Sequence, residues 1–229
     1  MIIPRLSHER GFVEHDWLKS RHSFSFANYY DPNFMGFSAL RVINEDWIAP
    51  SMGFGMHPHK DMEILTYVLS GAVAHKDSMG NSETVPAGEF QLMSAGTGVR
   101  HSEFNPSDTD ELHLYQIWIM PNRMGVTPRY EQAKFDDHMG GTLILSPTGE
   151  SGSFVVYQDM KLWRYQLDGE QVVSLDKGRA YWLQVAKGSI TINGERYQAG
   201  DAVAIIDENQ VIAQSDEFAE FLLFDLPMS

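Results

Sequence analysis

The sequence contains 229 residues, of which 43% are hydrophobic and 12% aromatic, and this is enough apolar material for one large or two small cores. A disordered chain is therefore excluded. The 31 acidic residues outnumber the 17 basic ones, and the net charge of −14 disfavours binding to nucleic acid or anionic membranes. Because cysteine is absent, disulfides and thiolate metal sites are excluded, and any metal must bind through His, Asp, Glu or water.

No apolar stretch approaches the roughly 20 residues that a membrane-spanning helix needs. The first residues, Met1-Ile-Ile-Pro-Arg-Leu-Ser-His8, do not combine a charged head with a long apolar run, as a secretion signal would. We therefore expect a soluble, cytoplasmic protein that does not bind membranes, and we expect it to be a monomer.

The predicted secondary structure consists of short strands. Runs rich in β-branched and aromatic residues occupy 64–69, 112–119 and 221–226, and Gly, Pro, Asn or Asp bound them. No long helical periodicity competes with them. Strands that recur about every 8 to 12 residues are typical of an all-β sandwich or barrel.

A weak internal repeat predicts two such barrels. A glycine after a strand, a hairpin turn and an Ala-Gly-acidic triplet follow one another at 71, 80–81 and 87–89, and again at 188, 193–194 and 199–201. The second turn, Asn193-Gly194, is the dipeptide that a tight type I′ hairpin requires. Between the copies, residues 139–152 are rich in turn formers. We expect an N-terminal domain over 1–138 and a C-terminal domain over 139–229.

Histidine is confined to the N-terminal part of the chain, and its spacing predicts a metal site there. His57 and His59 flank a proline, and His101 and Glu103 flank a serine. Side chains at i and i+2 of a strand share a face, so each pair offers two donors to one point. Either pair alone is compatible with a structural role. Together, on facing strands, they form a site of three imidazoles and one carboxylate, which suits Fe, Mn, Ni, Co, Cu or Zn.

The same residues resemble the motifs of the cupin family. The first cupin motif corresponds to His57, His59, Glu63 and Gly71, and the second to the stretch from Gly80 to Gly88. Two departures are evident, because Gly71 is one residue late and Gln91 stands where the second motif supplies a histidine. The third imidazole is therefore expected from His101.

This displacement, together with the aromatic block over 22–37 and a C-terminal part without histidine, resembles the pirin family, and most closely its bacterial quercetin 2,3-dioxygenase branch. The resemblance extends over the whole chain. It implies a bicupin of two jelly-roll β-barrels packed together, with one divalent transition metal in the first barrel, for which Fe(II) is expected ahead of Zn, Mn, Ni, Co or Cu. The implied ligands are His57, His59, His101 and Glu103. Glu63 competes with Glu103 for the fourth position.

The implied activity is a dioxygenase that cleaves the heterocyclic ring of flavonols such as quercetin with O2 and releases CO, with Glu103 as the catalytic base. An alternative is a non-catalytic, metal-dependent redox sensor or transcription-cofactor-like binding protein. The resemblance to animal pirins implies this role. A third is a cupin isomerase, or a dioxygenase acting on another aromatic compound.

Further residues are given structural roles. His75 is expected in a solvated hairpin, and His113 in a hydrogen bond within the barrel. In the C-terminal domain, Ser174 and Asp176 align with His57 and His59. Neither replaces an imidazole, so that domain is expected to bind no metal.

Overall fold

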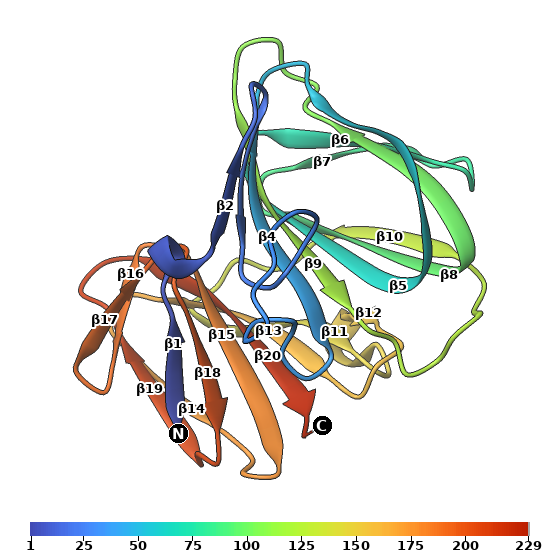
Figure 1. Cartoon of the computed structure of the whole chain (residues 1–229). Coiled ribbons are helices and arrows are strands. Elements are labelled where there is room, and N and C mark those ends of the chain that lie inside the picture. Colours follow the sequence, from blue (N-terminus) through green and yellow to red (C-terminus); the bar gives the residue numbers. More distant parts are fainter. Residues whose placement is uncertain (229) are drawn as a thin grey trace. The chain divides into compact units, whose positions relative to one another are not determined.

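The computed structural model describes residues 1–228, and almost all of its regular structure is β-sheet (Figure 1). This confirms the predicted all-β class. The chain divides into two compact units, one formed by residues 11–135 and the other by residues 1–10 together with 136–229. In residues 1–228, no helix is long and apolar enough to cross a membrane.

The unit formed by residues 11–135 contains one antiparallel sheet in the order β2-β3-β4-β9-β5-β8-β6-β7, with β10 added beside β8. Its strands are β2 (Gly11–Glu14), β3 (Leu18–His22), β4 (Leu40–Ile48), β5 (Gly53–Ser70), β6 (Ala72–Asp77), β7 (Ser82–Pro86), β8 (Glu89–Phe104), β9 (Leu112–Ile119) and β10 (Arg129–Lys134).

Strands β5 and β8 are the two longest, and they lie side by side (Figure 1). Bulges interrupt their pairing between Phe54 and His57 and again between His59 and Asp61. A bulge bends the strand and changes the direction of the side chains near it. The histidine segment of β5 therefore lies between two local bends, while the segment from Ile64 to Val68 is regular and buried in the core.

The other unit contains a seven-stranded sheet in the order β1-β18-β15-β20-β13-β11-β12 and a four-stranded sheet in the order β14-β19-β16-β17. A single core of residues such as Leu183, Ile190 and Phe221 is drawn from both sheets. Its elements are β1 (Ile2–Arg5), η1 (Ser7–Glu9), β11 (Gly140–Ser146), η2 (Glu150–Gly152), β12 (Phe154–Val155), β13 (Lys161–Leu167), β14 (Glu170–Ser174), β15 (Arg179–Lys187), β16 (Ser189–Ile192), β17 (Glu195–Gln198), β18 (Ala202–Ile206), β19 (Gln210–Gln214) and β20 (Ala219–Pro227).

The expected hairpin at Asn193-Gly194 joins β16 to β17, and both residues have positive φ, 52° and 82°. This is the conformation of the predicted type I′ turn.

The first ten residues differ from the sequence expectation, which assigned them to the N-terminal domain. Strand β1 pairs antiparallel with β18, from Ile2 opposite Ile205 to Arg5 opposite Ala202. Arg10 continues the association, because its Nη1 donates to the carbonyl of Gly200 at 2.9 Å. Residues 1–10 therefore belong to the second unit, which resumes at Asp136 rather than at residue 139. The pairing spans about two hundred residues of chain, so local sequence gave no signal of it.

Candidate metal centre

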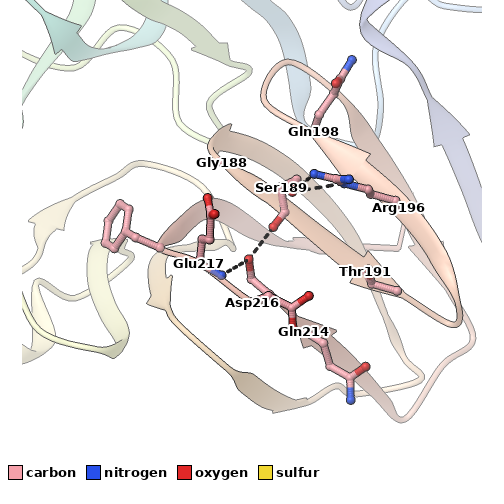
Figure 2. A pocket seen from close by; sticks show the side chains of 10 residues that line it. Gly188, Ser189, Thr191, Arg196, Gln198, Gln214, Asp216 and Glu217 are labelled. Atoms are coloured by element: carbon pink, nitrogen blue, oxygen red, sulfur yellow. Dashed lines mark hydrogen bonds between the residues drawn. The ribbon is translucent and has the colours of Figure 1, made fainter.

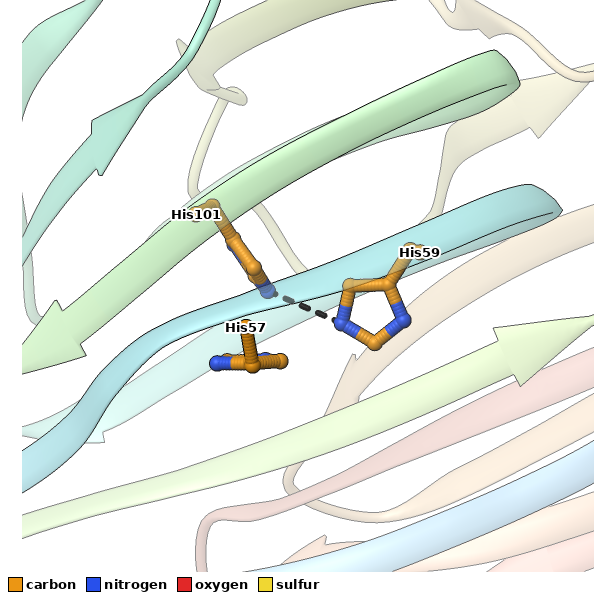
Figure 3. Close-up of side chains that lie close together, drawn as sticks. All are labelled: His57, His59 and His101. Atoms are coloured by element: carbon orange, nitrogen blue, oxygen red, sulfur yellow. Dashed lines mark hydrogen bonds between the residues drawn. The ribbon is translucent and has the colours of Figure 1, made fainter.

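The two donor pairs predicted from the sequence lie on adjacent strands. His57 and His59 are on β5, His101 and Glu103 are on β8, and the register places His57 directly opposite His101. Figure 3 shows the three imidazoles turned toward one another from these strands. The alternation of side chains along each strand thus directs the histidines to the same face of the sheet.

The three rings are close enough to share one ion. The Nε2 atoms of His59 and His101 are 3.1 Å apart, and the ring centroids of the three histidines are separated by 4.5 to 4.9 Å. One ligand nitrogen from each ring lies within 4.8 Å of the others. The Nδ1 of His57 lies 2.7 Å from the carbonyl of Gly55. Since a carbonyl accepts only, Nδ1 carries the proton and Nε2 keeps its lone pair for a metal.

The environment keeps the imidazoles in the form that binds metals. Burial, followed by the proximity of His101 and His57, lowers the pKa of His59 from 6.5 to about 4. Burial also lowers the pKa of His101, although Glu103 opposes the shift. Both rings are therefore neutral at pH 7, and neutral imidazole is the ligand form.

Glu103 is buried and held by three side chains beneath it. The amide of Gln116 donates to Oε2 at 2.6 Å, while Gln91 and Thr66 donate to Oε1 at 3.3 and 3.4 Å. Burial alone would raise the pKa of Glu103, but the nearby His101 and the bond from Gln116 outweigh it, so the pKa is lowered. The carboxylate is accordingly ionised at neutral pH, as a metal ligand must be.

These three donors belong to a row of polar side chains across the sheet. Gln116 pairs with Thr66, and Thr66 pairs with Gln91, so β9, β5 and β8 each contribute one residue to the row. The row continues to β4, where Asn44 pairs with Gln116. The register of the sheet therefore builds a polar floor under Glu103.

His75 is a site residue that the sequence interpretation missed, and its expected solvent exposure is wrong. It is fully buried, its Nε2 lies 2.8 Å from Oδ2 of Asp77, and its ring stacks on Tyr130. It forms a second group of close ligand atoms with His101 and Glu103. His75 and Asp77 repeat the imidazole–carboxylate spacing of His101 and Glu103, and that spacing was the available signal.

Glu63, the competing carboxylate, lies in neither group of ligand atoms. Its Oε2 accepts a hydrogen bond from Ser94 at 3.0 Å and lies 3.8 Å from Nη2 of Arg129. A buried carboxylate paired with a guanidinium is already neutralised. The geometry therefore favours Glu103 over Glu63. His113 bonds to Glu45 at 3.0 Å, which confirms its predicted hydrogen-bonded role.

A cavity of about 370 Å³ opens beside the histidines and is lined by His57, His59 and Glu103. Apolar side chains such as Phe26, Phe54 and Trp118 form part of its wall, and Trp118 packs edge-on against His59 with centroids 4.9 Å apart. A cavity of this size that combines aromatic side chains with converging polar groups is typical of a small-molecule site. Asn28 and Phe26 come from the aromatic block singled out in the sequence.

A larger cavity, of about 580 Å³, lies in the second unit, and most of the side chains that line it are polar. Figure 2 shows Arg196 of β17 directed at Ser189 of β16, whose Oγ it contacts at 3.0 Å. In the described part of the chain, both groups of side chains able to hold a metal lie between His57 and Glu103, so this cavity contains neither.

The donor atoms of the first unit fit a divalent transition metal. Neutral imidazole nitrogens and an ionised carboxylate are ligands that such ions take, and no thiolate is available to favour softer ones. The Nε2 atoms of His59 and His101 face each other at 3.1 Å, a separation that two nitrogens bound to one ion at about 2.0–2.1 Å also have.

Comparison with known proteins gives matches over nearly the whole chain. Residues 5–119 match the family model for pirin, and residues 143–226 match that for the quercetinase C-terminal cupin domain. A quercetin 2,3-dioxygenase of Escherichia coli K12 is 60% identical over 229 residues, 99% of each chain. A putative quercetin 2,3-dioxygenase of Pasteurella multocida is 53% identical, covering 99% of this chain and all of its own.

Solved structures agree with these sequence matches. The crystal structure of YhhW from E. coli is 60% identical, has a TM-score of 0.97 and matches 100% of this chain and 99% of its own. A crystal structure of the bacterial pirin YhhW in complex with nickel(II) is 59% identical, has a TM-score of 0.96 and covers both chains fully. Two oxalate decarboxylase structures from Bacillus subtilis, 10% identical with TM-scores of 0.68 and 0.69, share the fold.

Proposed function

Because this chain belongs to the pirin family, we propose that it is a metal-dependent dioxygenase that cleaves the heterocyclic ring of flavonols with O2 and releases CO. The observation that carries the proposal is the opening of a histidine cluster into an aromatic-walled cavity of about 370 Å³. In the balanced reaction, the ring carbon that carries the 3-hydroxyl leaves as CO. Both oxygen atoms of O2 remain in the ring-opened ester.

The proposed metal ligands are His57, His59, His101 and Glu103. Two observations support this set. The three imidazoles converge, and Glu103 belongs with His101 to the second group of close ligand atoms. A divalent ion there supplies Lewis acidity, which lowers the pKa of a bound hydroxyl, and open coordination positions for small ligands. Fe(II) is the proposed ion, since histidine–carboxylate sites with open positions are typical of non-haem iron oxygenases.

Glu103 is the proposed base. Its carboxylate is ionised and lines the cavity, so it can accept the proton of the flavonol 3-hydroxyl. Gln116 and Gln91 fix its orientation by donating to separate oxygens. These amides also disperse the negative charge of the carboxylate, so Glu103 is a weak base and suits a substrate hydroxyl that is already acidified.

The aromatic walls position the substrate. Trp118 contacts both His59 and Phe26 edge-on, at centroid distances of 4.9 and 5.5 Å. Phe54 is fixed by Trp17 at 5.2 Å, also edge-on. Rigid aromatic side chains accommodate a flat polycyclic compound and exclude water from it. A cytoplasmic, monomeric state completes the proposal, supported by the sequence expectations alone.

The test is oxygen uptake with CO detection, using protein loaded separately with Fe, Mn, Ni, Co or Cu and a panel of flavonols and catechols. We expect flavonol-dependent oxygen uptake with CO in equal amount, and none from a His57→Ala, His59→Ala double variant. No flavonol turnover with any metal would overturn the proposal and favour the redox-sensing or binding role. Uptake of oxygen with catechols, without CO, would indicate a dioxygenase of different substrate class.

A further inference from the structure

We infer that His15 and Asn28 form a polar mouth to the cavity and bind the 7-hydroxyl of the flavonol, so that the protein favours flavonols hydroxylated at that position. The inference rests on the proposed function, because it requires a flavonol whose 3-hydroxyl is directed at Glu103. It assigns the specificity of the same cavity to two residues that take no part in metal binding.

The cavity has a buried end and an exposed end. Glu103, at the buried end, is only 2% exposed. Among the residues that line the cavity, His15, Ala27 and Asn28 are the exposed ones, so they mark its mouth. A ligand that directs one group at Glu103 therefore extends its opposite side toward these three residues.

The two polar side chains at the mouth are available to a ligand. Neither the amide of Asn28 nor the imidazole of His15 has a hydrogen-bond or ionic partner within residues 1–228. Because both side chains are exposed, a ligand hydroxyl can take the place of water there. An amide and a neutral imidazole each offer a donor and an acceptor, and a phenolic hydroxyl can both donate and accept. Each side chain can therefore bond the same hydroxyl.

Both polar residues stand in tight turns. The backbones of His15 and Leu18 exchange hydrogen bonds of 2.7 and 3.3 Å between β2 and β3. Those of Phe26 and Tyr29 exchange hydrogen bonds of 3.0 and 2.9 Å, so that Asn28 is one of the two residues at the tip of this turn. A turn closed by two such bonds restricts its backbone, so each side chain is presented to the cavity from a defined point.

The surrounding structure holds the turn that carries Asn28. Ala27, the other residue at its tip, has a φ of 48°, in the left-handed region that favours glycine. An alanine keeps this conformation only where its surroundings enforce it. Phe26 packs edge-on against Trp118 at a centroid distance of 5.5 Å. At the other end of the turn, the ring of Tyr29 covers Gly11, where a Cβ would lie 2.4 Å from its Cγ.

The shape of a flavonol decides which of its hydroxyls reaches the mouth. On the fused ring system, the bonds to the 3-hydroxyl and to a 7-hydroxyl point in opposite directions. The pendant ring, by contrast, is attached to the carbon next to the one that carries the 3-hydroxyl. With the 3-hydroxyl at Glu103, the 7-position therefore faces His15 and Asn28. A hydroxyl at position 5 bonds internally to the ring carbonyl and does not compete for these side chains.

The experiment compares binding of 3-hydroxyflavone and 3,7-dihydroxyflavone, which differ by one hydroxyl. The protein is loaded with Zn(II), which has no redox chemistry. Binding is followed by tryptophan fluorescence, because Trp118 lines the cavity. We expect wild type to bind 3,7-dihydroxyflavone about 10-fold tighter than 3-hydroxyflavone. Asn28→Ala and His15→Ala should each reduce this ratio about 3-fold, and the double variant should bring it to about one.

The control ligand is 3,4′-dihydroxyflavone, because its second hydroxyl is on the pendant ring. The ratio of its affinity to that of 3-hydroxyflavone should be the same in wild type and in the variants. Asn33→Ala is the matched control variant, because Asn33 is an exposed asparagine of the same segment that does not line the cavity. It should keep the wild-type ratio for 3,7-dihydroxyflavone.

Zinc content and the thermal unfolding midpoint are measured for every variant, and the single variants decide the outcome if the double variant does not fold. Equal affinities of wild type for 3-hydroxyflavone and 3,7-dihydroxyflavone would overturn the inference. An unchanged ratio in the folded variants, an equal loss for 3,4′-dihydroxyflavone, or no binding at all would overturn it too.

Oxygen uptake by the iron-loaded wild type distinguishes this result from failure of the proposed function. Flavonol turnover without discrimination at the 7-position removes the inference and leaves the function. Discrimination in binding that is lost in the variants, without turnover in wild type, retains the inference and removes the function.

Discussion

The side-chain amide of Gln116 donates a hydrogen bond of 2.6 Å to Oε2 of Glu103, and its own oxygen accepts from Nε1 of Trp118 at 3.3 Å. A wall residue of the cavity is thereby linked to the carboxylate proposed as base. The orientation of Glu103 is thus fixed by the sheet beneath it, because Gln91 and Thr66 hold the other oxygen.

Replacement of Glu103 by glutamine should slow flavonol turnover per bound metal by about 10²- to 10⁴-fold, equivalent to about 3 to 5.5 kcal/mol of barrier. Glutamine keeps the shape and one oxygen but cannot take a proton. Metal content should fall less than turnover, since three imidazoles remain. Quercetin consumption and CO release, normalised to measured metal, test this. Glu63→Gln is the control, because it changes a buried carboxylate that lies outside both groups of ligand atoms. Wild-type turnover in Glu103→Gln would show that Glu103 is not the base that accepts the substrate proton.

Metal content should be about one equivalent per chain in wild type and close to none in the His57→Ala, His59→Ala double variant. The variant loses two of the three convergent nitrogens. Elemental analysis after reloading and desalting measures the content. Asp176→Ala, in the second unit, should retain the full equivalent. A full equivalent in the double variant, or a loss in Asp176→Ala, would show that the ion binds elsewhere.

Metal-free protein should lose stability as the pH falls from about 7 to about 4. The pKa of His59 is about 4 in the folded chain, against an ordinary 6.5. Between these values the unfolded chain binds a proton that the folded chain does not, so unfolding is favoured. Below 4 both states are protonated and this contribution is constant. Thermal midpoints at a series of pH values, compared with those of His59→Gln, isolate it. Parallel curves for the two proteins would contradict the assignment.

Substitution of Gly53 by alanine should destabilise the first unit and weaken metal binding. A Cβ at Gly53 would lie 2.2 Å from the carbonyl oxygen of Glu103 and 2.5 Å from Cα of Phe104. The clash pushes on the backbone of β8 where it carries the carboxylate, and overpacking of this kind costs about 1–3 kcal/mol. Thermal unfolding and metal titration measure both effects.

Gly55→Ala is the matched control for this substitution. It lies two residues away on β5, and a Cβ there meets nothing within 4 Å. Unchanged stability and metal affinity in Gly53→Ala would mean that β8 adjusts without moving Glu103.

The two donor pairs and the all-β class were predictable from the sequence alone. His57 with His59, and His101 with Glu103, were recognisable because side-chain direction along a strand depends only on spacing. The hairpin at Asn193-Gly194 was equally local, since Asn and Gly tolerate the two positive φ angles that a type I′ turn requires.

The tertiary structure decided which of these faces meet. It placed His75 of β6 behind His101, paired Glu63 with Arg129, and joined β1 to β18. It also brought His15 and Asn28 to the cavity of the histidines. The spacing of His75 and Asp77 marks them as a donor pair, but none of these contacts has a local signature, because each depends on the pairing of strands that are separated along the chain. Spacing shows which side chains share a face, while long-range register determines what that face contacts.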